Sequence, residues 1–287
     1  MTSPTDAAWR PSELELARRA TRRRTSTRSA LIALLSTVVF VGVVAVAVAS
    51  SPGWDGVRAS FFNPEIALAS FPAILAGLWV NIQVLLVAAV AVAALGTFLA
   101  VLRSLRGPVF FPLRALAAVY TDLFRGMPLL IVLYLVGFGI PALGVFGRVP
   151  VVLWGTIAIV LTYSAYVAEV LRAGMEAVHP SQRIAARSLG LSHAQTLRIV
   201  VIPQGVRKVV PALMNDFVSM QKDVGLISVL GAVDAVRAAQ IQVAQSYNFT
   251  PYIVAGLLFV AMSLPMIRLT DAVAARLARR EQNGGVV

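Results

Sequence analysis

The polar residues best able to do chemistry in this sequence interrupt long apolar stretches. Lys222 and Asp223 are adjacent in one stretch, Asn215 precedes them, and Asn81 and Gln83 interrupt another. A charged side chain at the centre of a bilayer costs about 2.5–3.5 kcal/mol, so it usually has a function or a partner there. An amino acid carries both an ammonium and a carboxylate, and adjacent opposite charges suit it. These five residues therefore predict a path for a polar solute, with Lys222 and Asp223 at its midplane.

A structural role for the same residues is the alternative. Side chains of neighbouring residues point about 100° apart on a helix, so Lys222 and Asp223 cannot simply pair along one face. Each could instead bind a neighbouring helix or act at a gate. Asn and Gln side chains also hold helices together in membranes, at roughly 0.6 kcal/mol per hydrogen bond. The sequence leaves both interpretations open.

Several kinds of chemistry are absent from the sequence. There is no cysteine, and His179 and His193 are the two histidines, so we expect neither a thiol nucleophile nor a metal site. No HExxH motif or plausible Ser/His/Asp set suggests an enzyme. The chain also lacks the Gly-x-x-x-x-Gly-Lys-Ser/Thr phosphate loop. We therefore expect no catalytic residue and no cofactor, and any ATP must be bound by a separate chain.

The composition indicates a membrane protein. Of the 287 residues, 58% are apolar and 13% are charged, and the charged share is about half that of a soluble domain. A bilayer-spanning helix needs about 20 apolar residues. We predict an all-α polytopic protein with six spans, at residues 29–49, 74–102, 126–147, 149–168, 209–230 and 250–267.

The basic residues predict the orientation of these spans. The formal net charge is +12, and most arginines lie in the N-terminal tail, after the second and fourth spans, and in the C-terminal tail. Such a bias marks the cytoplasmic side, so both termini are expected there. A nucleic-acid binder would instead gather basic charge on a polar domain, so we expect no nucleic-acid partner.

Five segments follow from this topology. The first span resembles a signal peptide, but its apolar run exceeds the usual length of about 7–15 residues, which favours an uncleaved anchor. The segments are a basic cytoplasmic tail (1–28), an extra N-terminal transmembrane helix (29–49), an external loop (50–73), a core (74–280) with a cytoplasmic loop (172–208), and a C-terminal tail (281–287).

The cytoplasmic loop carries clear local signals. It is expected to contain two short helices separated by a glycine turn. The signals are Ser181 as the cap of a helix to Leu189, a left-handed Gly190, a capping box of Ser192 and Gln195, and Pro203 at the end of the second helix.

Two functions fit this loop equally well. Ala185 and Ala186 are small enough for another surface to approach the backbone, and Arg183 and Arg187 lie on one side of the helix. The loop could therefore dock into a partner protein. Alternatively, it could lie at the membrane surface with its arginines at the lipid headgroups.

Residues of the loop resemble a known family. The run Gln182-Arg183-Ile184-Ala185-Ala186-Arg187-Ser188-Leu189-Gly190, followed by Val200-Val201-Ile202-Pro203, resembles the EAA loop of ABC importer permeases. Ile184 departs from this pattern because the family usually has Glu there. Arg125-Gly126-Met127-Pro128-Leu129-Leu130 and Lys222-Asp223-Val224-Gly225-Leu226 are similar to motifs of permeases for polar amino acids of the histidine, glutamine and glutamate type.

The resemblance implies an architecture, partners and a location. The fold would be the five-helix core of a type I ABC importer permease plus one N-terminal transmembrane helix, in a bacterial plasma (inner) membrane. A cytoplasmic ATPase dimer, a second permease subunit and an extracellular or periplasmic solute-binding protein would be the partners. The departure at Ile184 and the altered motif after Lys222-Asp223 slightly favour a heterodimer. The ATPase would contact the loop at Gln182, Arg183, Ala185, Ala186, Arg187, Gly190 and Pro203.

An ion-coupled secondary transporter is the alternative function. That class usually has internal repeats with broken helices in matching positions, and no such repeat is visible here.

Overall fold

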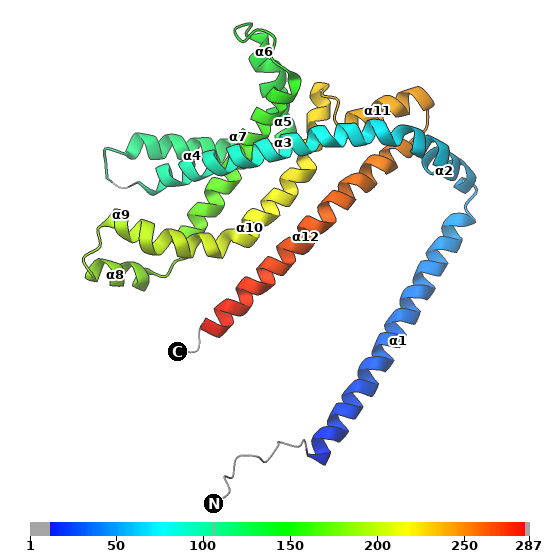
Figure 1. Ribbon diagram of the computed structural model, residues 1–287, viewed down its shortest axis with the longest axis horizontal. Coiled ribbons are helices and arrows are strands. Elements are labelled where there is room, and N and C mark those ends of the chain that lie inside the picture. The colour runs from blue at the N-terminus through cyan, green and yellow to red at the C-terminus, as the bar shows by residue number, and fades with distance from the viewer. Residues whose placement is uncertain (1–11, 106, 285–287) are drawn as a thin grey trace, which may run out of the picture. The chain divides into compact units, whose positions relative to one another are not determined.

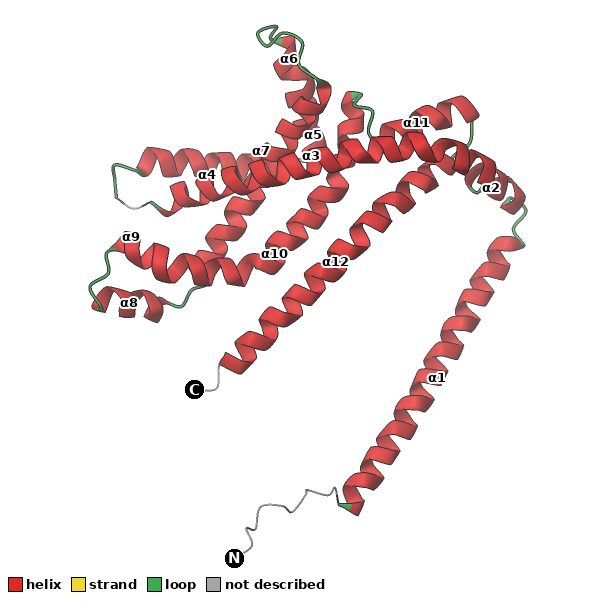
Figure 2. Ribbon diagram, in the orientation of Figure 1, coloured by secondary structure: helices red, strands yellow, loops and turns green. Residues whose placement is uncertain are grey.

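The described part of the protein consists of helices and connecting segments. The computed structural model describes residues 12–105 and 107–284, and these contain no strand. Figure 1 shows the order of the helices, and Figure 2 shows them joined by short loops and turns. The chain forms two compact units, residues 1–59 and residues 60–287.

The first unit is built on a single long helix. Helix α1 (Glu13–Ala49) begins at Ser12, whose hydroxyl accepts a hydrogen bond from the amide of Glu15 at 3.3 Å. Its stretch Thr27–Ala49 is apolar and long enough to cross a bilayer, and none of its most apolar window is buried against protein. A helix that exposes apolar side chains all round is suited to lipid. The predicted span at 29–49 is therefore helical, and residues 1–11 of the predicted tail lie outside the described residues.

The segment predicted as an external loop, residues 50–73, is mostly helical. It contains α2 (Trp54–Phe61) and the start of α3 (Pro64–Ser104). Asn63 caps α3 by accepting hydrogen bonds from the amides of Glu65 and Ile66, and Pro64 occupies the first turn, where it needs no donor. The helix therefore begins ten residues earlier than the predicted core at residue 74.

Four helices of the described chain can cross a bilayer by length and composition, or up to six if each of two bent pairs forms one span. In the second unit, the long helices are α3, α7 (Val151–Glu176) and α12 (Thr250–Gly284). One bent pair joins α4 (Phe111–Gly126) to Leu129–Ala142 at 107°. The other joins the run His193–Leu230 to α11 (Ala235–Ser246) at 50°. Neither α4 nor α11 was predicted as a separate helix.

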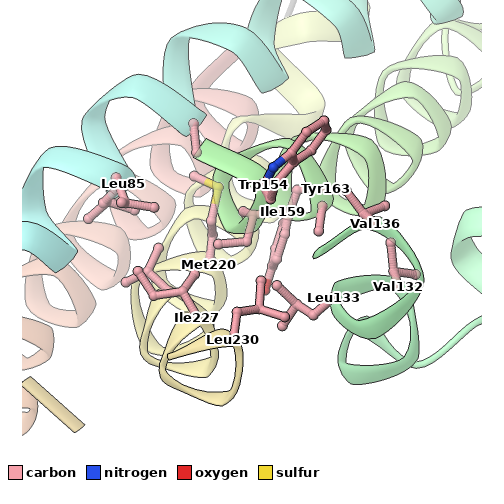
Figure 3. Packing of buried hydrophobic residues seen from close by; sticks show 14 of the residues in the cluster. Leu85, Val132, Leu133, Val136, Trp154, Ile159, Tyr163, Met220, Ile227 and Leu230 are labelled. Carbon is pink, nitrogen blue, oxygen red and sulfur yellow. The ribbon is translucent and has the colours of Figure 1, made fainter. Parts of the chain in front are cut away.

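The core of the second unit lies where α3, α7 and α10 (Ile202–Asp223) meet the segment after α4. That segment consists of α5 (Leu129–Tyr134), the π-helical turn η1 (Leu135–Gly139) and α6 (Ile140–Ala142). Figure 3 shows the packing. Its buried side chains include Leu85, Val132, Leu133, Val136, Trp154, Ile159, Tyr163, Met220, Ile227 and Leu230.

Asn81 of α3 joins two further elements in the interior, the start of α11 and the 3₁₀ turn η3 (Val224–Leu230) that follows α10. It is fully buried; its amide nitrogen donates to Asp234 Oδ2 at 2.9 Å and to the carbonyl of Val224 at 3.2 Å. Its oxygen accepts from the amide of Ala235 at 3.0 Å, which completes the N-terminal cap of α11. Both donors of Asn81 are therefore used within the protein, which gives it a structural role rather than the predicted place on a solute path.

Replacing Asn81 by Leu should destabilise the protein strongly. The change leaves Asp234 and the amide of Ala235 buried without this partner, and each such group costs about 1–3 kcal/mol. We expect the thermal midpoint of the purified protein in detergent to fall. Gln83→Leu is the control because Gln83 is exposed on the same helix, and it should change stability by no more than about 0.5 kcal/mol. Equal midpoints for the two variants would contradict the role assigned to Asn81.

Candidate functional site

The loop between α7 and α10, predicted to be cytoplasmic, forms the helix, turn and helix that its sequence predicts. Helix α8 (Pro180–Ser188) ends before Gly190, whose φ of +82° is left-handed as predicted. Helix α9 (His193–Thr196) begins with the predicted capping box. Ser192 Oγ accepts from the Gln195 amide at 3.3 Å, and Gln195 Oε1 accepts from the Ser192 amide at 2.8 Å.

Two details of this loop were predicted wrongly. His179, not Ser181, caps α8, because His179 Nδ1 accepts from the amide of Ser181 at 3.2 Å. Pro203 does not end a helix. It lies in the first turn of α10, directly after the π-helical turn η2 (Leu197–Val201). The wider π turn changes the hydrogen-bond pattern just before a residue that has no N–H, so the helical run continues past the proline.

The two ends of the loop are held together by an unusually close helix crossing. A Cβ atom on Gly174 of α7 would lie 2.7 Å from the carbonyl oxygen of Gly205 and 2.5 Å from Val209 Cγ1, both of α10. Only glycine at position 174 leaves room for the Gly205 backbone and the Val209 side chain to approach this closely. Helices α7 and α10 are therefore fixed to each other at the point where the chain leaves for the loop and returns.

Two basic side chains reinforce this crossing. Arg183 Nη2 donates to the carbonyl of Met175 at 2.5 Å, and Lys208 Nζ donates to the carbonyl of Ala177 at 2.7 Å. Both carbonyls belong to the C-terminal end of α7, where cations are favoured by the helix dipole. Arg183 is therefore at least partly occupied within the chain and is less available to a partner than predicted.

An ion-pair cluster around Glu169 fixes the same end of α7 to two other helices. Glu169 Oε2 lies 2.7 Å from Arg103 Nη1 of α3 and 3.7 Å from Arg125 Nη1 of α4. Its other oxygen lies 2.6 Å from Arg172 Nη2, and Arg172 also pairs with Glu176. The base of the loop is thus connected to α10 by the glycine crossing and to α3 and α4 by these ion pairs.

The outer face of the loop is partly apolar. Ile184 is 65% exposed and Leu189 is 82% exposed, whereas Ala186 is buried and Ala185 is exposed. The predicted pair of small residues is therefore split between two faces of α8. Gln182, Arg187 and Pro203 are exposed as a contact role requires. Both exposed apolar side chains are available for contact with another surface. Leu189 was not among the predicted contact residues, although its position between Arg187 and the glycine turn could have indicated it.

A second candidate site is a cavity of about 320 Å³ beside the break between α4 and α5. One face of α7 and one face of α10 supply its polar side chains. The lining residues are Met127, Pro128, Leu129, Thr162, Tyr163, Tyr166, Asp216, Ser219 and Asp223.

Five residues were predicted on a solute path. Of these, Asp223 alone is among the described residues that line the cavity. Gln83, Asn215 and Lys222 are exposed elsewhere. Helical periodicity explains this outcome. Residues 216, 219 and 223 share one face of α10, and Asn215 and Lys222 each precede a member of that face by one position, about 100° away. Asp216 joins Asp223 in the cavity, and the seven-residue spacing of the two carboxylates was the signal that could have found it.

The two carboxylates of the cavity are compensated unequally. Asp223 Oδ2 accepts a hydrogen bond from the Tyr163 hydroxyl at 2.7 Å. Asp216 Oδ2 is buried and has no hydrogen-bond partner among the described residues. A buried carboxylate oxygen is costly when it has no hydrogen-bond partner, so Asp216 is the less compensated of the two.

A second cavity of about 330 Å³ adjoins the first and shares Tyr163 and Asp216 with it. Its other lining residues are mostly apolar, and they reach Leu171 of α7 and Val206 of α10, close to the glycine crossing. Tyr163 and Asp216 therefore separate a polar chamber from an apolar one that extends toward the loop.

Cavities between bent helices, a firmly held surface loop and several lipid-compatible helices together define a membrane transport subunit. Residues 105–279 match the family model described as the inner membrane component of binding-protein-dependent transport systems, and the chain belongs to this family. The matched region contains the whole loop and both carboxylates of the cavity.

Curated relatives cover most of the chain. The arginine transport system permease protein ArtQ of Bacillus subtilis is 32% identical over 208 residues, which are 72% of this chain and 93% of the relative. A probable amino-acid ABC transporter permease protein of Sinorhizobium fredii, y4tG, is 35% identical over 216 residues, which are 73% of this chain and 91% of the relative.

Solved structures show the same fold. An amino acid ABC transporter crystallised with histidines matches with a TM-score of 0.66 and 34% identity, over 71% of this chain and 94% of that chain. The MetNI methionine ABC transporter matches at 16% identity with a TM-score of 0.56, over 71% of this chain and 95% of that chain, which supports the fold alone. The fold is that of a type I ABC importer permease, as predicted, and the comparisons give no support to an ion-coupled secondary transporter.

Replacing Gly174 by Ala should destabilise the crossing of α7 and α10. The new Cβ would overlap the backbone of Gly205, and overpacking of this kind costs about 1–3 kcal/mol. Gly256→Ala is a matched control because Gly256 is also inside a helix but has open space around its Cβ position. It should stabilise the protein by up to about 1 kcal/mol through helix propensity. Thermal unfolding in detergent should therefore shift in opposite directions, and parallel shifts would contradict the close crossing.

Proposed function

We propose that this chain is the membrane subunit of an ABC importer that moves a polar amino acid into a bacterial cell. Relatives named as arginine and glutamine transport permeases support the solute class. In this proposal, a separate cytoplasmic ATPase dimer binds and hydrolyses the ATP, and this chain has neither a cofactor nor a catalytic residue of its own. A second permease subunit and an external solute-binding protein complete the assembly in the inner membrane.

The continuity between the loop and the cavity carries this proposal. The run His193–Leu230 is one helical segment that begins in the loop and contains both cavity carboxylates, Asp216 and Asp223. A force applied at α9 therefore reaches the cavity along one helical run. ATP can change the conformation of the permease only by favouring one state over another, and a rigid connection of this kind passes that preference on.

The exposed face of the loop supplies the surface for the ATPase. Ile184 and Leu189 are large, apolar and exposed, and the exposed Arg187 lies between them in the sequence. At protein interfaces, a few buried apolar and arginine side chains provide most of the binding energy. The position where the family usually has Glu is apolar here, so we expect its contact with the ATPase to be hydrophobic.

The same face could alternatively lie against lipid headgroups, and a charge at Leu189 distinguishes the two cases. Leu189→Arg should reduce the amount of ATPase subunit that copurifies by about tenfold or more, because a charge would be buried at the interface. Attachment to a lipid surface would instead tolerate or favour an added arginine. ATP-dependent uptake of amino acids should fall with ATPase binding.

Val145→Arg is the control for this experiment. Val145 is 71% exposed and lies in the connection after α6, on the side predicted to be external. This variant should leave ATPase binding unchanged. If Leu189→Arg bound the ATPase as well as the unaltered chain does, the docking role of the loop would be wrong.

A further inference from the structure

We propose that the N-terminal part of α1 binds anionic lipid headgroups at the membrane surface, through the arginines that directly precede its apolar span. The family match covers residues 105–279 and therefore gives this segment no role, and neither does the proposed transport function. The inference does not depend on transport. It rests on the charge of the segment, on the helix that carries it and on the distance of each arginine from the bilayer.

The segment before the span is strongly basic. The run from Arg18 to Arg24 reads Arg-Arg-Ala-Thr-Arg-Arg-Arg, and Arg28 follows at the start of the span. The acidic residues of the first turn of α1 are Glu13 and Glu15, and no Asp or Glu follows them in the sequence as far as Ala49. Clusters of about four to eight basic residues beside a transmembrane helix are typical of binding to anionic lipids.

The helical spacing of the arginines favours an external counter-charge. Helix α1 is continuous from Glu13 to Ala49 (Figure 1), so the basic run is part of the same helix as the span. Positions four apart are neighbours on a helix, and like charges at this spacing repel each other and destabilise it. The pairs with this spacing are Arg18 and Arg22, Arg19 and Arg23, and Arg24 and Arg28. Because α1 itself has no acidic residue among them, an anionic surface outside it would stabilise this part of the helix.

The apolar span fixes where that surface lies. The stretch Thr27–Ala49 can cross a bilayer, and none of its most apolar window is buried against protein. With a rise of about 1.5 Å per residue, Arg22 and Arg23 lie about 6–8 Å before Thr27 along the helix, and Arg18 and Arg19 lie about 12–14 Å before it. Electrostatic screening at physiological ionic strength has a length of about 8 Å. Arg22 and Arg23 are therefore within one screening length of the headgroups, and Arg18 and Arg19 are beyond it.

A topology signal is the simplest alternative explanation of the arginines, and an acidic protein or a nucleic acid is an alternative partner. A topology signal acts while the span is inserted and requires only that basic residues lie near its end. It does not require a helix that continues through repeated like-charge pairs. A protein or nucleic acid would have to be recruited to the arginines, whereas the span itself holds them at the lipid surface. The observations therefore favour lipid.

The lipid composition around each end of the span tests this inference. The sequence contains no cysteine, so a fluorophore on Ser29→Cys reports from the basic end of the span, and one on Ser51→Cys reports from just beyond the other end. The full chain is reconstituted in vesicles of phosphatidylcholine and phosphatidylglycerol, and either lipid carries an acyl-chain quencher. Phosphatidylglycerol should quench the label at residue 29 about fivefold more effectively than phosphatidylcholine. This ratio should fall toward one in about 0.5 M NaCl, and it should be close to one at residue 51 throughout.

Two double variants provide a matched comparison. Arg22→Gln with Arg23→Gln, and Arg18→Gln with Arg19→Gln, each remove two adjacent charges and the same two like-charge pairs, so their effects on the helix itself are alike. They differ in their distance from the bilayer. The first variant should lower the preference for phosphatidylglycerol at residue 29 about threefold, and the second should lower it less than about 1.5-fold. Circular dichroism should show equal helix content in both.

Three results would overturn lipid binding by this segment. They are the absence of a preference for phosphatidylglycerol at residue 29, an equal preference at residues 29 and 51, and an equal loss of preference in the two double variants. The arginines would then be a topology signal or a site for another partner. The importer proposal is tested separately by ATPase copurification and ATP-dependent uptake, and its failure would leave a measured lipid preference unchanged.

Discussion

The contact between Gly174 and Gly205 is the constraint on which the rest of the structure depends. It brings the backbones of α7 and α10 closer than any side chain would allow, and the loop leaves and re-enters the helical bundle at this point. Nearby, Arg183 and Lys208 cap the end of α7, and the ion pairs of Glu169 add α3 and α4. The base of the loop therefore behaves as part of the packed interior rather than as a flexible connection.

The same pair of helices also forms the cavity. Thr162 and Tyr163 come from α7, and Asp216 and Asp223 come from α10, so any change in how the two helices pack alters the distance between the hydroxyl and carboxylate groups. A conformational preference imposed at the loop and a preference imposed by a bound solute would act on one shared contact. Reciprocal coupling of this kind needs only that each ligand binds one arrangement of that contact more tightly than another.

Local signals in the sequence predicted the local structure well, and long-range contacts account for the errors. Gly190 and the capping box of Ser192 and Gln195 depend on neighbours within a few residues, and the structure confirms them. The start of α11 has a local cap, Asp234, but it is also bound by Asn81, which lies 154 residues before Ala235, and no local pattern records that pairing. Pro203 was predicted to end a helix because proline lacks an N–H. In the structure, a π-helical turn just before Pro203 removes this conflict, and such a turn has no sequence signature of its own.

The predicted solute path shows why adjacency in sequence is a poor guide to a site inside a membrane. Lys222 and Asp223 were predicted as a pair because they are neighbours of opposite charge. Neighbours on a helix face different directions, however, and Lys222 is exposed while Asp223 lines the cavity. The informative partner was Asp216, two helical turns earlier on the same face. By helical face, the carboxylates of α10 form an acidic pair, Asp216 and Asp223, whereas the neighbours Lys222 and Asp223 had predicted a neutral, zwitterion-binding pair.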